Sequence, residues 1–265
     1  MLSFSNYNER ETYQRTLANA SGIAIGSGLG RNLALVEKLD FLLAAFEGKP
    51  VVIDADFFYF LRVHTKHTLE ALRKARVCVF TPNMVEFDKL FNHIMGFDFD
   101  FKNLDKFIDT LPGSDLPPEE KEEILEINLF DNVPQLKAFF EKIDIPSLHV
   151  VLKYREDVIF NKKSAFLCRA KASLKRCGGQ GDILTGLCSF LISSSISNGV
   201  EPINGILAAS WLTRSASWAA YSKIKLGLIA SDIICEISPL VNSLSDGEDS
   251  LDFKIADLSE DPKSE

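Results

Sequence analysis

The stretch Pro50-Val51-Val52-Ile53-Asp54-Ala55-Asp56 runs from four apolar residues into two carboxylates. A short run rich in Val and Ile and closed by a turn is typical of a parallel strand buried on both faces. Comparable runs lie at residues 21–25, 77–80 and 149–152, and they end in Gly-Ser-Gly-Leu-Gly, Thr-Pro-Asn and Lys, respectively. We therefore expect buried strands whose ends carry polar or glycine-rich turns.

Segments with helical patterns separate these runs. Residues 32–46, 65–74 and 85–93 are helical candidates, and the first has leucines at helical spacing. Residues 182–195 and 202–226 are apolar on nearly all sides, which predicts buried helices, and 232–241 could form one more. The alternation of strands and helices predicts an α/β fold, a doubly wound, mostly parallel sheet with helices on both faces.

The domain organisation follows from composition along the chain. We expect one α/β domain over residues 1–242 and an acidic, Ser-rich, disordered tail over 243–265. Residues 96–144 contain three prolines in one short stretch together with a run of acids. We interpret this segment as an acidic surface insertion with one or two helices.

Composition also narrows the classes of function. The chain has 265 residues and a formal net charge of −8, which argues against a general nucleic-acid binder because phosphate contacts need clustered Lys and Arg. Its five cysteines form no Cys-x-x-Cys pair, which favours a reducing compartment over a disulfide framework or a zinc site. Because no stretch resembles a signal peptide or a membrane span, we expect a cytoplasmic protein without nucleic-acid or membrane partners. The sequence leaves the oligomeric state open, and a homo-oligomer is among the alternatives.

The strongest local motif is Arg176-Cys177-Gly178-Gly179-Gln180-Gly181-Asp182, followed at once by an apolar helical run. Three glycines in four positions let backbone amides approach a ligand closely, and the free N–H groups at the start of a helix favour an anion. Asp182 at this junction could act as a base toward a hydroxyl beside a bound phosphate. The alternative is a glycine turn in which Asp182 caps the helix.

The first two strand ends carry further candidates. Gly26-Ser27-Gly28-Leu29-Gly30 suits either close approach to a phosphate or an ordinary tight turn. Asp54 and Asp56 could help to hold Mg²⁺ or could cap the next helix.

The next two strand ends are also polar. Asn83 and Glu86 have the spacing of a capping box, which predicts the start of a helix. Lys153 and Arg155 could face phosphates or could belong to a solvated hairpin turn.

Taken in this order, the motifs resemble one family, the eukaryotic ATP-dependent (S)-NAD(P)H-hydrate dehydratases, a branch of the ribokinase-like superfamily. The matching stretches are GSGLGRN at 26–32, VVIDAD at 51–56, TPNMVEF at 81–87, VVLKYRED at 150–157 and RCGGQGD at 176–182. RCGGQGD followed by an apolar helix is the specific element, and the other stretches gain force from their order and spacing.

The resemblance implies an enzyme that uses ATP and Mg²⁺ to phosphorylate the hydroxyl of hydrated NADH or NADPH and then eliminates phosphate. It implies that Asp182 is the catalytic base and also contacts the substrate. Nucleotide contacts are implied for Lys153, Tyr154, Arg155, Glu156, Asp157, Ala172, Ser173, Leu174, Lys175, Arg176, Cys177, Gly178, Gly179, Gln180 and Gly181. Contacts with the hydrated dinucleotide are implied for Gly28, Asn83, Met84, Val85, Glu86, Phe87, Asp88 and Lys89.

The chain departs from the family pattern at four positions. Phe57 and Tyr154 replace glycines, Met84 replaces a histidine and Ser27 replaces a proline. A side chain resists the backbone conformations open to glycine, so both replacements could crowd the site, although Tyr154 could instead stack on adenine. Family members also carry a further N-terminal strand–helix unit, so we expect a shortened or truncated chain.

Three hypotheses for function therefore stay open. The first is an active dehydratase, the second a non-catalytic nucleotide-binding protein, and the third a small-molecule kinase of the same superfamily. The fold alone does not decide among them, because one fold hosts many activities.

Overall fold

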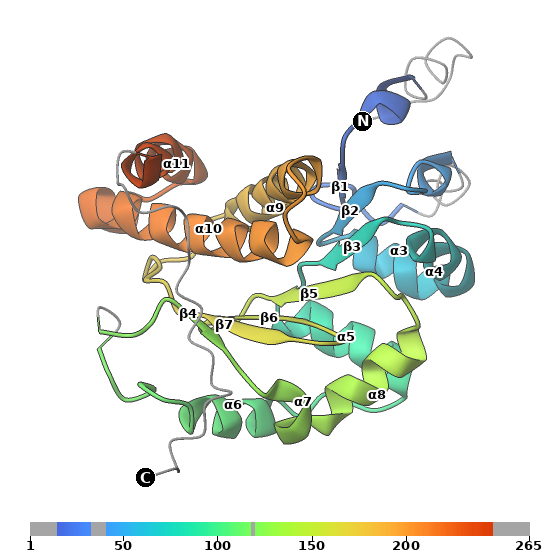
Figure 1. Cartoon of the computed structure of the whole chain (residues 1–265), viewed down its shortest axis with the longest axis horizontal. Helices are drawn as coiled ribbons and strands as arrows, with labels where there is room; N and C mark the ends of the chain where they lie inside the picture. Colours follow the sequence, from blue (N-terminus) through green and yellow to red (C-terminus); the bar gives the residue numbers. More distant parts are fainter. Residues whose placement is uncertain (1–14, 33–40, 118–119, 246–265) are drawn as a thin grey trace.

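Figure 1 shows the computed structural model of the chain, which describes residues 15–32, 41–117 and 120–245. Within these residues the central element is a seven-stranded sheet with the order β1-β2-β3-β5-β6-β7-β4. Four strands are parallel, namely β1 (Ile23–Ile25), β2 (Pro50–Ile53), β3 (Val77–Phe80) and β5 (Leu148–Leu152). Three continue the sheet as antiparallel neighbours, namely β6 (Asp157–Asn161), β7 (Ala165–Cys168) and β4 (Ile124–Glu126). The α/β fold expected from the sequence is confirmed, with an antiparallel part that the sequence patterns do not predict.

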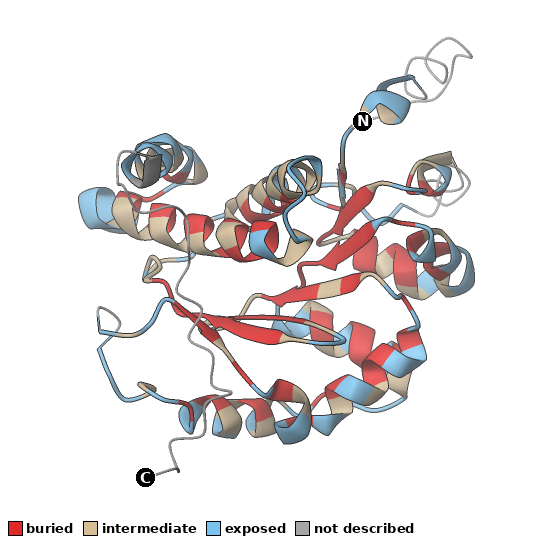
Figure 2. Cartoon of the chain, viewed as in Figure 1, coloured by how far each residue is buried: buried red, intermediate tan, exposed pale blue. Residues whose placement is uncertain are grey.

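The two faces of the sheet bury different helices, because side chains alternate between the faces of a strand. Val52, Val79 and Val151 pack in one cluster with residues of α9 (Gln180–Ser197) and α10 (Pro202–Ile224). Their neighbours Val51, Cys78 and Val150 belong to the core on the other face. That face is covered by α3 (Phe57–Val63), α4 (Thr65–Arg73), α5 (Met84–Met95) and α8 (Pro134–Ile143). Figure 2 shows the buried strands between these two layers of helices.

Phenylalanine dominates the larger core. The ring of Phe87 on α5 lies 5.1 Å from that of Phe99, 5.7 Å from Phe139 and 6.2 Å from Phe160, mostly in edge-to-face or tilted geometry. Aromatic pairs of this kind contribute about 0.5–1.5 kcal/mol beyond their buried area. Phe87, which the family resemblance implies as a substrate contact, is fully buried and anchors α5 instead.

The segment 96–144 is part of the sheet and the core rather than a surface insertion. It contains α6 (Phe101–Asp109), β4, α7 (Leu129–Asn132) and α8, and β4 pairs with β7 at the edge of the sheet. Leu125, Phe139 and Phe140 are almost fully buried. The acidic composition misleads because the acids lie mainly on outward-facing positions, while apolar residues between them fill the core.

The C-terminal helices form a separate, smaller cluster. α11 (Ala230–Ser245) follows a short 3₁₀ turn, η2 (Lys225–Gly227), and packs on α10 through Ala216, Ala220 and Ile233. Cys177 and Ile183, at the start of α9, are packed against the same cluster. The helix expected at 232–241 is therefore present and longer than predicted.

Two expectations fall wholly or partly outside the described residues. These are the helix expected at 32–46, of which 33–40 are not described, and the disordered tail at 243–265. Of that tail, the structure describes only residues 243–245, which continue α11.

The turn after β1 requires glycine at its first position. Gly26 has a φ of 128°, and a Cβ built there would lie 1.7 Å from the carbonyl oxygen of Asp54. We expect Gly26→Ala to lower the free energy of unfolding by about 2–4 kcal/mol, because backbone strain and overpacking add. Urea denaturation measures this loss. Gly28→Ala is the matched control, since Gly28 has a φ of 64° with open space around it and should cost only about 1–2 kcal/mol. Equal losses in the two variants would contradict the steric argument.

Candidate functional site

The carboxyl ends of the parallel strands meet at one edge of the sheet. The register aligns Ile25 with Ile53, Ile53 with Phe80, and Phe80 with Val150. The turns that follow these strands therefore lie side by side, and ligands of open α/β sheets bind at such an edge. The backbone N–H of Lys153 also donates to the carbonyl of Pro82 at 2.9 Å, which joins the last two turns directly.

A buried ion pair stands at the centre of this edge. Lys153 Nζ lies 2.8 Å from Asp54 Oδ1, and Asp54 is only 2% exposed. The hydroxyls of Thr81 and Ser27 also donate to the Asp54 carboxylate, at 3.0 and 3.3 Å. A buried carboxylate needs such partners, because desolvating it without them is costly. Asp54 therefore orients Lys153, a pairing across 99 residues that the sequence motifs do not reveal.

Asp56 holds the glycine loop in place. Its carboxylate accepts hydrogen bonds from the backbone N–H of Gly30 at 3.0 Å and from Arg31 Nε at 2.9 Å. It does not cap α3 through its side chain. Both carboxylates considered for Mg²⁺ are thus already engaged by cations, and the described residues contain no group of three or more His, Cys, Asp or Glu placed to share a metal ion. Neither carboxylate is therefore placed in a protein cage for Mg²⁺ within the described residues.

The glycine-rich motif leads into α9 beside this ion pair. Gly179, with a φ of 89°, precedes the helix, so α9 begins at Gln180 and not at Asp182. A Cβ built on Gly181 would lie 3.5 Å from Lys153 Nζ and 3.8 Å from Asp54 Oδ2. The N-terminus of α9 and the Lys153 ammonium therefore lie next to each other, and both favour an anion.

Asp182 occupies the first turn of α9 and is not its N-cap, which corrects the alternative drawn from the sequence. Its side chain is exposed and has no hydrogen-bond or ion-pair partner within the described part of the chain. A carboxylate free in this way can accept a proton or a hydrogen bond from a ligand.

A first cavity, of about 380 Å³, opens beside the start of α9. Ten residues implied as nucleotide contacts line it, namely Lys153, Tyr154, Arg155, Asp157, Ala172, Ser173, Arg176, Cys177, Gln180 and Gly181. Thr213 and Arg214 of α10 also line it; the stretch 212–214 resembles the family as well, but no nucleotide contact was implied for it. The other five residues implied as nucleotide contacts do not line this cavity. Leu174 is largely exposed, Glu156 and Lys175 bond elsewhere, and Gly178 and Gly179 lie outside the lining. Burial raises the pKa of Cys177, which disfavours the thiolate at this position.

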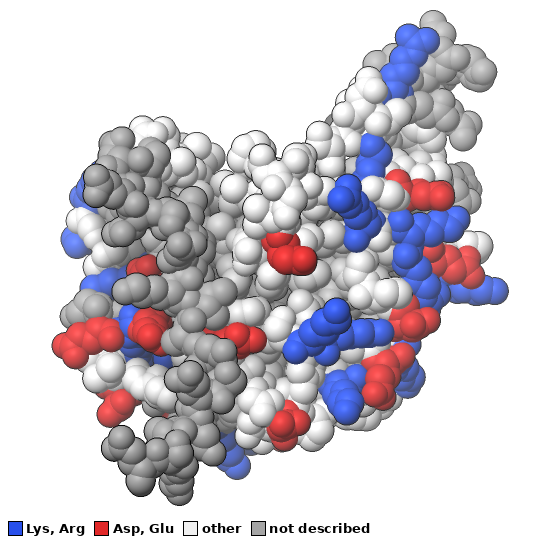
Figure 3. Space-filling model, in the orientation of Figure 1, with Lys and Arg blue, Asp and Glu red and all other residues white. Residues whose placement is uncertain are grey.

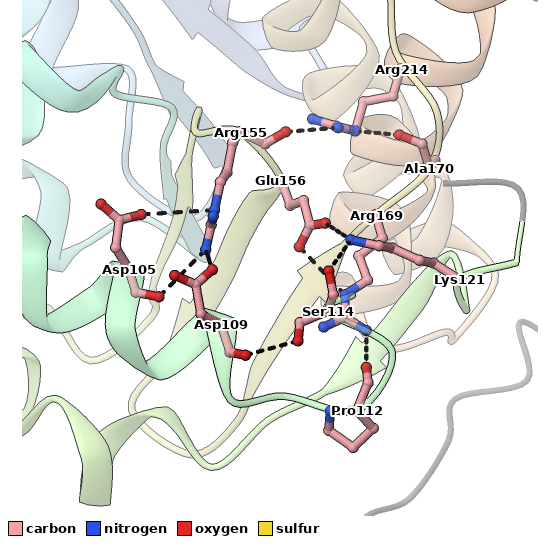
Figure 4. A network of polar contacts seen from close by, with 10 residues as sticks. All are labelled: Asp105, Asp109, Pro112, Ser114, Lys121, Arg155, Glu156, Arg169, Ala170 and Arg214. Carbon is pink, nitrogen blue, oxygen red and sulfur yellow. Dashed lines mark hydrogen bonds and ion pairs between the residues drawn. The ribbon is translucent and has the colours of Figure 1, made fainter. Parts of the chain in front are cut away.

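The turn between β5 and β6 is held by a polar network on its outer side. As Figure 4 shows, Arg155 reaches Asp109 at 2.6 Å, and Glu156 meets Lys121 at 3.1 Å and Arg169 at 3.4 Å. Arg214 donates to the carbonyl of Arg155 at 3.0 Å from the other side. The Arg155 guanidinium therefore belongs to a hairpin network, whereas Lys153 lies at the sheet edge beside Asp54 and the start of α9.

A second cavity, of about 140 Å³, lies on the other side of Asn83. Four residues implied as dinucleotide contacts line it, namely Asn83, Val85, Glu86 and Lys89. Asn83 and Glu86 also form the expected capping box of α5. Gly28 and Met84 do not line it, and Asp88 accepts the backbone N–H of Phe99 instead.

Comparison with known proteins decides the family. The family model described as NAD(P)H-hydrate dehydratase matches residues 2–110 and 131–239. The chain belongs to this family. A mouse protein named ATP-dependent (S)-NAD(P)H-hydrate dehydratase is 26% identical over 246 residues, which are 89% of this chain and 62% of the mouse protein.

Solved structures support the fold of the NAD(P)H-hydrate dehydratase family. The Bacillus subtilis ADP/ATP-dependent NAD(P)H-hydrate dehydratase, co-crystallised with ATP and Mg²⁺, has a TM-score of 0.54 at 17% identity, covering 86% of this chain and 68% of that one. A ribokinase-like superfamily protein from Enterococcus faecalis has a TM-score of 0.57 at 17% identity, covering 89% and 68%. The ribokinase-like α/β fold expected from the motifs is confirmed.

The family model does not match residues 111–130, which include the edge strand β4 and Lys121 of the hairpin network. Phe57 fits in place of the family glycine, because its φ is not positive and its ring is buried in the core.

No helix in the described ranges is both long and apolar enough to cross a membrane.

Tyr154, the second replacement of a family glycine, lines the first cavity and also packs against α6. Its hydroxyl donates to Asp105 at 2.7 Å, and its ring stacks on Phe101 with a centroid distance of 6.0 Å. Burial and the bond to Asp105 raise the pKa of Tyr154 to about 12. The backbone here has no positive φ, so this replacement is accommodated without strain.

The raised pKa of Tyr154 gives a pH-dependent prediction. Because the folded pKa lies above the ordinary value of about 10, the stability that this phenol contributes is complete below about pH 10 and is lost as pH rises through about 12. Absorbance of tyrosinate should show a late ionisation in the native protein that is absent in Tyr154→Phe and retained in Tyr221→Phe. Ionisation of all the tyrosines together near pH 10 would contradict the assigned environment.

Proposed function

We propose that this chain restores NADH or NADPH from its (S)-hydrate with the consumption of ATP. The observation that carries the proposal is the placement of the α9 N-terminus against the Lys153–Asp54 pair, at the edge where the two cavities adjoin Asn83. Family membership and the names of the relatives support the same activity.

In the proposed arrangement the nucleotide occupies the first cavity. Its terminal phosphate lies at the N-terminus of α9, where backbone N–H groups and Lys153 stabilise the charge of the transferring phosphoryl group. Arg176 is exposed at the cavity wall, with no partner in the part of the chain that is described, and is free to meet the remaining phosphates. Mg²⁺, when bound with ATP, neutralises phosphate charge.

Asp182 is the proposed base. Its carboxylate accepts the proton of the substrate hydroxyl while the oxygen bonds to phosphorus and ADP leaves. The carbon–oxygen bond then breaks, inorganic phosphate departs, and loss of a proton from the neighbouring carbon restores the ring double bond. The products are NADH or NADPH, ADP and phosphate.

The test is recovery of NADH from enzymatically hydrated NADH, followed at the dihydronicotinamide absorbance with Mg²⁺ and ATP, ADP or no nucleotide. We expect recovery with ATP and none without a nucleotide. Formation of ADP and a phosphorylated product without NADH would favour a small-molecule kinase. No turnover by folded protein would favour a nucleotide-binding protein without activity.

A further inference from the structure

Two stretches of the chain that line the first cavity are joined outside it. Residues 153–155 and 157 of the β5–β6 turn belong to the lining, as do residues 172–173 of the segment after β7. Glu156 lies in the first stretch and Arg169 precedes the second, and Glu156 Oε2 lies 3.4 Å from Arg169 Nε. Neither of these two residues lines the cavity. The spacing between two parts of the cavity wall therefore depends on an ion pair outside the lining.

A second cation completes the pairing of Glu156. Lys121 Nζ donates to Glu156 Oε1 at 3.1 Å, and the side chains of Lys121, Glu156 and Arg169 are only 13%, 16% and 2% exposed. Figure 3 shows basic and acidic side chains next to one another at the left of this face, where Figure 1 places the connection between α6 and β4. Because the three side chains are largely shielded from solvent, salt screens them less than it screens exposed charges.

Both cations also hold the connection between α6 and β4. Lys121 Nζ donates to the carbonyl of Ser114 at 3.1 Å, and Arg169 Nη1 donates to the carbonyl of Pro112 at 2.7 Å (Figure 4). The backbone N–H of Arg169 donates to the carbonyl of Glu123 at 2.7 Å. The described part of this connection is thus fastened to the β5–β6 turn through the two partners of one carboxylate.

Arg169 depends on Glu156 for the balance of its charge. Its Nε and Nη2 are buried and have no hydrogen-bond partner in the part of the chain that is described. Among the same residues its ion pair is with Glu156. A buried cation that loses its carboxylate is strongly destabilising, so the position of Arg169 relies on Glu156 more than on its other neighbours.

Helix α10 holds the same two stretches from the side of the cavity. Arg214 donates to the carbonyl of Arg155 at 3.0 Å and to the carbonyl of Ala170 at 2.7 Å. Nearly one turn earlier on α10, Trp211 Nε1 donates to the Glu123 carboxylate at 2.5 Å. Arg214 lines the cavity, so its replacement would change the lining itself. Lys121 and Glu156 instead offer a way to alter the spacing of the two stretches without altering the lining.

We propose that Glu156 is a positioning residue for nucleotide binding and that Lys121, on the connection between α6 and β4, supports it from outside the cavity. By holding Arg169, Glu156 fixes the β5–β6 turn relative to the segment after β7. This role replaces the nucleotide contact that the family resemblance implies for Glu156. The inference rests on the proposed function for the identity of the ligand, and Lys121 lies outside the residues that the family model matches.

The experiment titrates ADP with Mg²⁺ by calorimetry into the wild-type chain and into Lys121→Met. We expect the variant to bind ADP about 5- to 10-fold more weakly, near the lower end of the usual coupling between two sites. In the hydrate assay the KM for ATP should rise by the same factor while kcat stays, because the groups at the start of α9 are unchanged. Lys121→Arg should restore the affinity, since it keeps the charge.

Arg73→Met is the matched control for the loss of a cation. Arg73 also joins a carboxylate and a carbonyl, both of Asp144, at 3.5 and 2.8 Å, and it does not line the first cavity. Its replacement should leave the affinity for ADP unchanged. Thermal melts of all variants show whether each is folded.

A double variant tests whether Lys121 acts through Glu156. Glu156→Gln keeps the size of the side chain but deprives Arg169 of its carboxylate, so it should weaken ADP binding at least as much as Lys121→Met. Lys121→Met added to Glu156→Gln should cause little further loss. Two residues that act independently would instead multiply their losses.

The outcomes separate this inference from the proposed function. Weaker ADP binding in Lys121→Met, restored in Lys121→Arg, supports the positioning role, and the same result in a chain without hydrate turnover keeps that role and rejects the proposed function. Unchanged ADP affinity in Lys121→Met, with hydrate turnover present, overturns the positioning role alone. Multiplied losses in the double variant, or no ADP binding by the folded wild type, also overturn it.

Discussion

Asp182→Asn removes ATP-dependent recovery of NADH and leaves the fold intact. We expect a fall in kcat of roughly 10²–10⁴-fold, the usual contribution of a positioned general base. The amide keeps the size of the side chain but cannot take the hydroxyl proton. The wild-type side chain is exposed and makes no bond to another described residue, so its replacement has little to disturb in the folded state.

The measurement pairs the hydrate assay with a thermal melt. Asp131→Asn is the matched control, because Asp131 also stands in the first turn of a helix, α7, on the opposite side of the sheet. It should keep full turnover. Full turnover in Asp182→Asn would remove Asp182 as the base and would leave the glycine motif as an anion site only.

Lys153→Met lowers both the stability of the chain and its affinity for ATP. The change leaves Asp54, only 2% exposed, without its cation, and breaking a buried pair in this way costs about 3–5 kcal/mol. Thr81 and Ser27 still donate to the carboxylate, so we expect the lower end of that range. Urea denaturation measures the stability, and nucleotide titration measures the affinity.

A double variant tests whether the pair is the cause. Asp54→Asn combined with Lys153→Met removes both charges, so it should recover a large part of the lost stability but none of the affinity for ATP. Lys223→Met, which breaks the more exposed pair with Glu236, should cost less than about 1 kcal/mol. A loss in Lys153→Met no larger than in this control would contradict the role assigned to Asp54.

The parallel half of the fold follows from local patterns. Val51, Val52 and Ile53 are all fully buried, and a strand buried on both faces has little choice but a continuous apolar run. The capping box of Asn83 and Glu86 was predictable for a similar reason, since all its atoms lie within one helical turn.

Long-range pairings were not predictable in the same way. The Lys153–Asp54 pair spans 99 residues, and no local pattern records which carboxylate a lysine meets. The contact between Tyr154 and Asp105 similarly depends on how α6 packs beside the β5–β6 turn. The strand β4 was not predicted from the sequence, because a strand of three residues among many acids shows too weak an alternation of apolar and polar residues.

The small cluster in which α11 packs on α10 has a consequence for the motion of the glycine-rich loop that precedes α9 (residues 176–181). Because α11 packs outside the main cores, its backbone amides should exchange with solvent through a local opening that needs less free energy than global unfolding. Cys177 and Ile183 share that cluster, and a Cβ built on Gly179 would lie 2.9 Å from Ala230. Opening of α11 therefore loosens the loop, and a nucleotide held by the loop should slow amide exchange in α11 without touching most of that helix.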